Sequence, residues 1–182
     1  MLLFGSKLAW PAIAVGALAL AAIAVPADAA PAASGTGTIT VNLAAQASLA
    51  ENFVIAVPAS DLSVSYDKTA NTVSVAYSVT GVGGGAVNFG DGGATVVNIT
   101  NGKTVDLVDL TLDLATDQLV FTPEHGSPVA VLDLTGSVTT GSDGVSASAL
   151  SVDAAGAADL DGALATTAFH AGSQVGSFTS SF

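Results

Sequence analysis

The sequence contains no cysteine and no arginine, and it is poor in lysine and in aromatic residues. Without cysteine there is no disulfide, no thiol nucleophile and no lipid-modified cysteine, so the hydrophobic core alone must hold the fold. Without arginine there is no bidentate fork for a phosphate group or a guanine base. Fifteen acidic residues against three lysines give a net charge of −12, which repels nucleic acid and anionic membrane surfaces. We therefore expect no nucleic-acid partner.

The N-terminal segment has the features of an export signal. Lys7 precedes a continuous apolar stretch over residues 8–25, and the small residues Ala27 and Ala29 follow at the cleavage positions. This order predicts a signal peptide over residues 1–29 and a mature domain over 30–182, secreted or held at the cell surface or cell wall. The alternative is an uncleaved anchor, because a transmembrane helix needs about 18–20 apolar residues. Pro11 and the Ala-rich side chains favour cleavage, so we expect no membrane span in the mature protein.

The remaining chain, roughly 150 residues, is long enough for one domain with its own core. Short runs with a period of two, such as "GTITVNL" and "TVSVAYSV", are separated by Gly, Asn, Asp and Pro, which is typical of half-buried strands. "DKTAN" and Asn101-Gly102 predict hairpin turns. One segment, "DAAGAADLDGALATTAF" (153–169), has helical spacing with Asp153 as N-cap, and "LAAQASLAEN" (43–52) is a weaker helical candidate. The sequence predicts an all-β, antiparallel, sandwich-like single domain with one short C-terminal helix.

The acidic stretch "VDLVDLTLDL" (105–114) raises the question of a metal or acid–base site. A period of two from Val108 to Leu114 places Asp109 and Asp113 on one face, about 13 Å apart along a strand. That separation is too large for one cation or a catalytic carboxylate pair. Asp106 lies out of phase with them unless a bulge intervenes. We therefore predict a solvated strand face and no metal site.

No other motif indicates catalysis. "GVGGGA" (81–86) is not followed by a helix and predicts a turn, and "NFGDGG" is an isolated glycine-rich turn without the repeats of calcium-binding turns. The two histidines, His125 and His170, have no local partner at metal-ligand spacing. The sequence contains no G-x-S-x-G elbow. We predict that the protein is not an enzyme and has no catalytic residues.

The C-terminal half resembles a known family in the order of its parts. "LVDLTLDLATDQLVFT", then "VAVLDLTGSV", then "ALSVDAAGAADLDGALATTAFHAGSQVGSFT" is similar to the closing half of the HtaA-type domain, including the aromatic-x-x-Gly close from Phe169 to Gly172. That family is a secreted or wall-associated bacterial β-sandwich domain that binds haem in its best-known members. The resemblance implies a non-enzymatic surface module for an apolar or haem-like ligand, with haem as the one candidate cofactor.

The N-terminal half departs from that family. Its members hold haem iron through an early Tyr supported by a later His, whereas residues 30–62 here contain no Tyr and no His precedes "DLTLDL". Tyr66, Tyr77 and His170 are therefore candidate haem ligands by their chemistry alone. Since Lys68 and Lys103 are the only mature cations, we expect weak haem binding or none. The alternative function is a structural fibre or wall subunit that self-associates through an edge strand.

Overall fold

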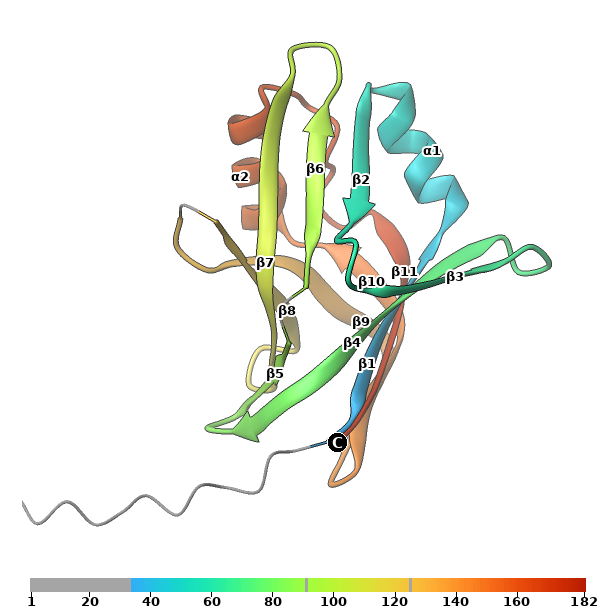
Figure 1. Cartoon of the computed structure of the whole chain (residues 1–182), viewed down its shortest axis with the longest axis vertical. Coiled ribbons are helices and arrows are strands. Elements are labelled where there is room, and N and C mark those ends of the chain that lie inside the picture. The colour runs from blue at the N-terminus through green and yellow to red at the C-terminus, as the bar shows by residue number, and fades with distance from the viewer. Residues whose placement is uncertain (1–33, 91, 125) are drawn as a thin grey trace, which may run out of the picture.

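The computed structural model describes residues 34–182 except 91 and 125, and this part of the chain forms eleven strands and two helices (Figure 1). The predicted signal segment lies outside the described residues. The strands are β1 (Thr36–Asn42), β2 (Val54–Pro58), β3 (Ser63–Asp67), β4 (Thr72–Gly83), β5 (Ala86–Phe89), β6 (Ala94–Asn98), β7 (Lys103–Asp113), β8 (Gln118–Pro123), β9 (Val129–Gly141), β10 (Gly144–Val152) and β11 (Gln174–Ser181). The helices are α1 (Leu43–Glu51) and α2 (Ala154–Leu164). Within these residues no helix combines the length and the apolar character needed to cross a membrane.

The sheet closes into an eight-stranded antiparallel barrel instead of the two layers of the predicted sandwich. The strand order is β2-β6-β7-β5-β4-β1-β11-β10-β9-β8. An additional pairing of β7 with β8 closes the part of this order that runs from β7 to β8 into a barrel. The all-β prediction is confirmed, whereas the sandwich is corrected. Strands of a sandwich and of a barrel show the same alternation of inward and outward side chains. The two architectures are distinguished by pairings between strands far apart in the sequence, here those of β1 with β4 and β11.

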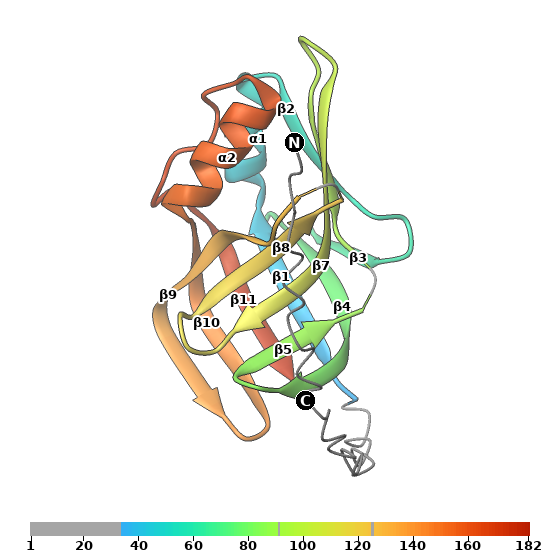
Figure 2. The ribbon, with the colours of Figure 1, turned by 90° about the vertical axis from the view of Figure 1, so that its left-hand side faces the viewer.

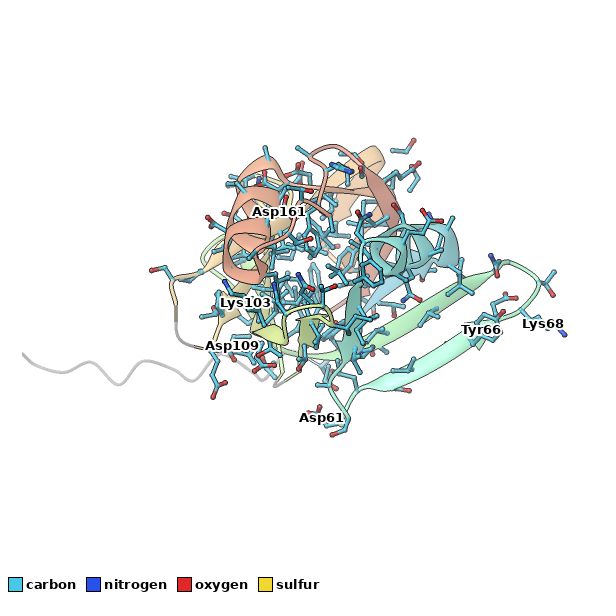
Figure 3. The ribbon with its side chains drawn as sticks, turned by 90° about the horizontal axis from the view of Figure 1, so that it is seen from above. Asp61, Tyr66, Lys68, Lys103, Asp109 and Asp161 are labelled. Atoms are coloured by element: carbon cyan, nitrogen blue, oxygen red, sulfur yellow. The ribbon has the colours of Figure 1, made fainter. Side chains whose placement is uncertain are left out.

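Three strands extend beyond the closed barrel. β2 pairs with β6, which pairs with the first half of β7, and β3 pairs with the first half of β4. The β3–β4 hairpin projects away from the body of the molecule, with Tyr66 and Lys68 near its end (Figure 3). Its turn is held by Asp67, whose carboxylate accepts hydrogen bonds from the backbone N–H of Ala70 and Thr69. These bonds lower the pKa of Asp67.

Both helices lie at the same end of the barrel (Figures 1 and 2). The predicted C-terminal helix is confirmed: the Asp153 carboxylate accepts hydrogen bonds from Ala155 N and Gly156 N, as expected of an N-cap. The weaker candidate over residues 43–52 is also a helix, α1, so the prediction of one helix is corrected to two. α1 has no buried residue, whereas α2 packs on β9 and buries Leu160 and Leu164.

A bulge in β7 resolves the phase of its aspartates. The pairing of β7 with β8 shifts between Val108 and Thr111, and Asp109 adopts a φ of 50°. Because the bulge adds one residue, Leu107 and Leu110 both lie buried in the core. Val108 is therefore not on the inner face, contrary to the simple alternation. Each carboxylate has local neighbours: Asp106 accepts from Thr95 Oγ1 at 2.5 Å and Asp113 from Ala115 N at 2.8 Å, while Asp109 is exposed. Among the described residues no group of three metal-ligating side chains occurs.

Candidate ligand cavity

A cavity of about 540 Å³ opens at the helical end of the barrel. Its lining comes from every described strand except β3 and β5, from α1, from Leu160 of α2 and from the segment after α2. Most lining side chains are aliphatic, and two are phenylalanines, Phe121 and Phe169. The polar side chains in the lining are Asn42, Gln46, Ser48, Tyr77, His170, Ser173 and Gln174. A cavity of this size and composition is typical of small-molecule binding sites.

Tyr77 supplies a buried hydroxyl to this cavity. Its side chain is only 4% exposed, and burial raises the pKa of the phenol to about 12, so the hydroxyl keeps its proton at neutral pH. The ring packs edge-to-face on Phe89, which packs in the same way on Phe178. In the cross-strand register Tyr77 faces Gly37 of β1, which leaves room for the aromatic row. The ring is therefore held from behind by the core.

His170 lies in the segment that joins α2 to β11. The backbone around it is fixed at three points: Phe169 N donates to the Asp161 carboxylate at 3.1 Å, Gly172 N to Val152 O at 2.8 Å and Ser173 N to His170 O at 3.0 Å. Gly172 has a φ of 77°, a conformation that glycine adopts without strain. These contacts bring Phe169 and His170 to the cavity margin.

The structure brings together two of the three candidate ligand residues. Tyr77 and His170 both line the cavity, whereas Tyr66 is 58% exposed on β3 and does not. The sequence analysis did not identify Gln46, Gln174 or the phenylalanines as lining residues. Weak amphipathicity conceals α1, and the segment after α2 has no periodic pattern. Of these residues, only Phe169 belongs to a pattern noted in the sequence, the aromatic-x-x-Gly close from Phe169 to Gly172.

The described lining of the cavity contains no Asp, Glu, Lys or Arg. Lys68 lies on the projecting hairpin and Lys103 at the start of β7, both exposed (Figure 3). A bound carboxylate would therefore meet no lysine or arginine, and its polar partners would be His170 and neutral side chains, mostly at the margin. The electrostatics of the site disfavour anions.

Comparison with known proteins gives one structural likeness. No family model and no curated protein matches the sequence. A solved structure, the crystal structure of heme binding protein HtaB from Corynebacterium glutamicum, aligns over 81% of this chain and 91% of that chain, with 13% identity and a TM-score of 0.49. At this identity and TM-score the likeness is distant, so the function has to be argued from the residues of this chain.

Proposed function

We propose that this chain is a non-enzymatic, exported module that binds an apolar or haem-like molecule in the cavity at the helical end of the barrel. The observation that carries the proposal is the cavity itself: about 540 Å³ of largely aliphatic and aromatic lining with one buried donor, Tyr77, and His170 at the margin. Apolar walls with a few placed polar groups are the usual form of a ligand site. A reaction would need a nucleophile–base pair or a metal group, and Tyr77 and His170 are the only titratable side chains in the described lining.

The residues fit part of a haem group. Tyr and His are both axial ligands of haem iron, and Tyr77 or His170 would hold the iron against apolar walls. The propionates would meet no lysine or arginine in the described lining, and their partners would be polar side chains such as Gln46, Ser48, Ser173 and Gln174. When bound, haem would supply an iron centre to the site. We expect weak haem binding or none, since charge-assisted hydrogen bonds to the propionates are missing.

Titration of the mature protein with haemin, followed by the Soret band, tests this site. Saturable binding in the cavity would shift the band, and Tyr77→Phe or His170→Ala would reduce the shift. Tyr66→Phe is the matched control, because Tyr66 lies outside the cavity. If Tyr66→Phe abolished the shift and Tyr77→Phe did not, haem would be bound elsewhere and the cavity would be the wrong site.

The structural-subunit function remains the second candidate, favoured by two free sheet edges. In the described sheet β2 pairs only with β6 and β3 only with β4, and both carry exposed apolar side chains, Ile55 and Val57 on β2 and Val64 and Tyr66 on β3. Such edges are templates for pairing with another chain. The size of the purified mature protein separates the candidates: a monomer favours the binding module and filaments favour the subunit.

Export is part of the proposal and is tested separately. The apolar run over residues 8–25 and the cleavage positions Ala27 and Ala29 support a mature N-terminus near Ala30. N-terminal sequencing of protein recovered from the producing cells should find this start. Recovery of a chain that still begins at Met1 would support the membrane-anchor alternative.

A further inference from the structure

The hydroxyl of Tyr77 has no hydrogen-bond partner among the described side chains and backbone groups. The residue is 4% exposed and lines the cavity. Among the described residues, every fully buried side-chain oxygen or nitrogen has a hydrogen-bond partner, so an unpaired oxygen must reach open space. The hydroxyl therefore borders the open space of the cavity. Water in the open cavity can bond this hydroxyl, and a ligand with an acceptor at this point would replace that water by a direct hydrogen bond.

Charge restricts the ligand further. An ionised carboxylate loses its hydration on entering an apolar site, and this is costly unless a cation pairs with it. The described lining contains no lysine or arginine, and the whole chain carries fifteen acidic residues against three lysines. The surface therefore repels an approaching anion, and the cavity offers it no compensation. Hydrocarbons and neutral polar molecules meet neither obstacle.

We propose that the cavity selects a neutral apolar molecule with a hydrogen-bond acceptor, such as an ester or a ketone, and discriminates against the corresponding carboxylate. Tyr77 is the specificity-determining residue: its hydroxyl donates to the acceptor of the ligand. The polar side chains of the described lining include no lysine or arginine that would favour an acid. This inference rests on the proposed function, because it defines the ligand class of the same cavity.

Three probe molecules distinguish occupancy of the cavity from its selectivity for neutral ligands. Diphenylhexatriene is a hydrocarbon whose fluorescence rises in apolar sites, so it reports occupancy of the cavity without a hydrogen bond. Methyl laurate and laurate, used as competitors at pH 7.5, share a chain and a carbonyl group but differ in charge. We expect methyl laurate to displace the dye at a concentration at least about tenfold below that of laurate, since burial of an unpaired charge costs more than burial of an ester.

The variants locate the effect. Tyr77→Phe should raise the methyl laurate concentration needed for displacement, corrected for the dye affinity of the same variant, by about three- to tenfold, as expected for one net hydrogen bond. Tyr66→Phe should leave this concentration unchanged. The one tryptophan of the sequence, Trp10, lies in the predicted signal peptide, so the predicted mature chain has none. Ala45→Trp, at the α1 side of the lining, therefore provides a single energy donor beside the cavity. Energy transfer from this position is expected for a dye in the cavity, and its absence would exclude that location.

The outcomes are distinct. Failure of the dye to bind, or binding without energy transfer, would overturn the cavity as a ligand site and the selectivity with it. Dye binding in the cavity, with laurate displacing it as well as methyl laurate does, would overturn the selectivity and leave the ligand site standing. An unchanged methyl laurate value in Tyr77→Phe would remove Tyr77 as the donor.

Discussion

Asn98 donates a hydrogen bond from Nδ2 to the backbone carbonyl oxygen of Leu164 at 3.1 Å, across 66 residues of sequence. Leu164 is the last residue of α2, and Asn101 Nδ2 donates to the same oxygen at 2.9 Å. Asn98 Oδ1 in turn accepts from Thr100 N at 3.0 Å. The β6–β7 hairpin therefore caps the C-terminus of α2 with two side chains, which joins the extension of the sheet to the helix beside the cavity.

Replacing Asn98 by Ala should lower the free energy of unfolding by about 1–3 kcal/mol, because it removes a buried side chain that bonds both Thr100 N and the carbonyl oxygen of Leu164. Chemical denaturation monitored by circular dichroism measures the change. Asn101→Ala should cost less, since Asn98 still bonds the carbonyl. The double variant should cost more than the sum, because the carbonyl then has no side-chain donor. Strict additivity would show that the two bonds act independently.

Gly156→Ala should destabilise the protein even though alanine is the better helix former. A Cβ at this position would collide with the backbone carbonyl oxygen of Ala130 in β9, which packs directly against α2. We expect a loss of about 1–3 kcal/mol from overpacking, measured by thermal or denaturant unfolding.

Gly162→Ala is the matched control in the same helix. A Cβ there has no atom within 4 Å outside the helix's own backbone, so we expect a gain of about 0.5–1 kcal/mol from helix propensity. Equal losses at both positions would contradict close packing of α2 on β9 as the cause.

The double change Asp109→Asn with Asp113→Asn should alter the free energy of unfolding by less than about 0.5 kcal/mol. Asn tolerates the positive φ of position 109, and its side-chain oxygen can still accept from Ala115 N at position 113. Ligand binding should also be unchanged, since neither residue lines the cavity. Loss of a bound cation, detected by elemental analysis, would mean that these carboxylates form a metal site.

Asp109→Val tests the bulge itself. At a φ of 50° a β-branched side chain is strained, so the protein should lose about 1–2 kcal/mol. Asp109→Gly should be neutral or stabilising. If valine were tolerated as well as glycine, the β7 backbone would differ from the bulge described above.

Burial of Tyr77 should make stability depend on pH in the alkaline range. The pKa of the phenol rises from 10.0 to about 12 on folding, so the unfolded chain ionises first. The contribution is complete below pH 10, declines as the pH rises from 10 to 12, and amounts to roughly 2–3 kcal/mol by linkage. Denaturant unfolding of wild type and Tyr77→Phe between pH 9 and 12 measures the difference. If the free energy of unfolding declined equally with pH in the two proteins, Tyr77 would ionise alike in the folded and unfolded states.

The sequence predicted the local elements well and the closure of the sheet poorly. The hairpins at Asn101-Gly102 and over residues 68–71, and the Asp153 cap of α2, depend on neighbouring residues and are confirmed. Closure depends on pairings between strands distant in sequence, such as β1 with β11, for which alternation carries no information. The position of the bulge could not be predicted either, because an aspartate is equally compatible with a regular strand and with a bulge at position 109.

The two tyrosines show the same limit within the site. "LSVSY" and "SVAYSV" have the same local alternation, in which each Tyr shares a face with the valines of its strand. Tyr77 is buried because β4 has β1 beside it, with Gly37 opposite. Tyr66 is exposed because β3 is an edge strand on a hairpin that projects from the barrel (Figure 3). Which tyrosine reaches the cavity is thus a property of neighbouring strands and not of the local pattern.

The shallow packing of α1 has a consequence for kinetics. Helices of this length have little stability of their own in water, and no residue of α1 is fully buried: Ala44, Ala45 and Leu49 line the cavity, and Leu49 is only partly buried against the core. Its amides should therefore exchange with solvent by local opening at a small fraction of the global free energy of unfolding. The residence time of a bound molecule would then be governed by the opening of α1, and substitutions along this one helix could change release rates while the barrel wall stays intact.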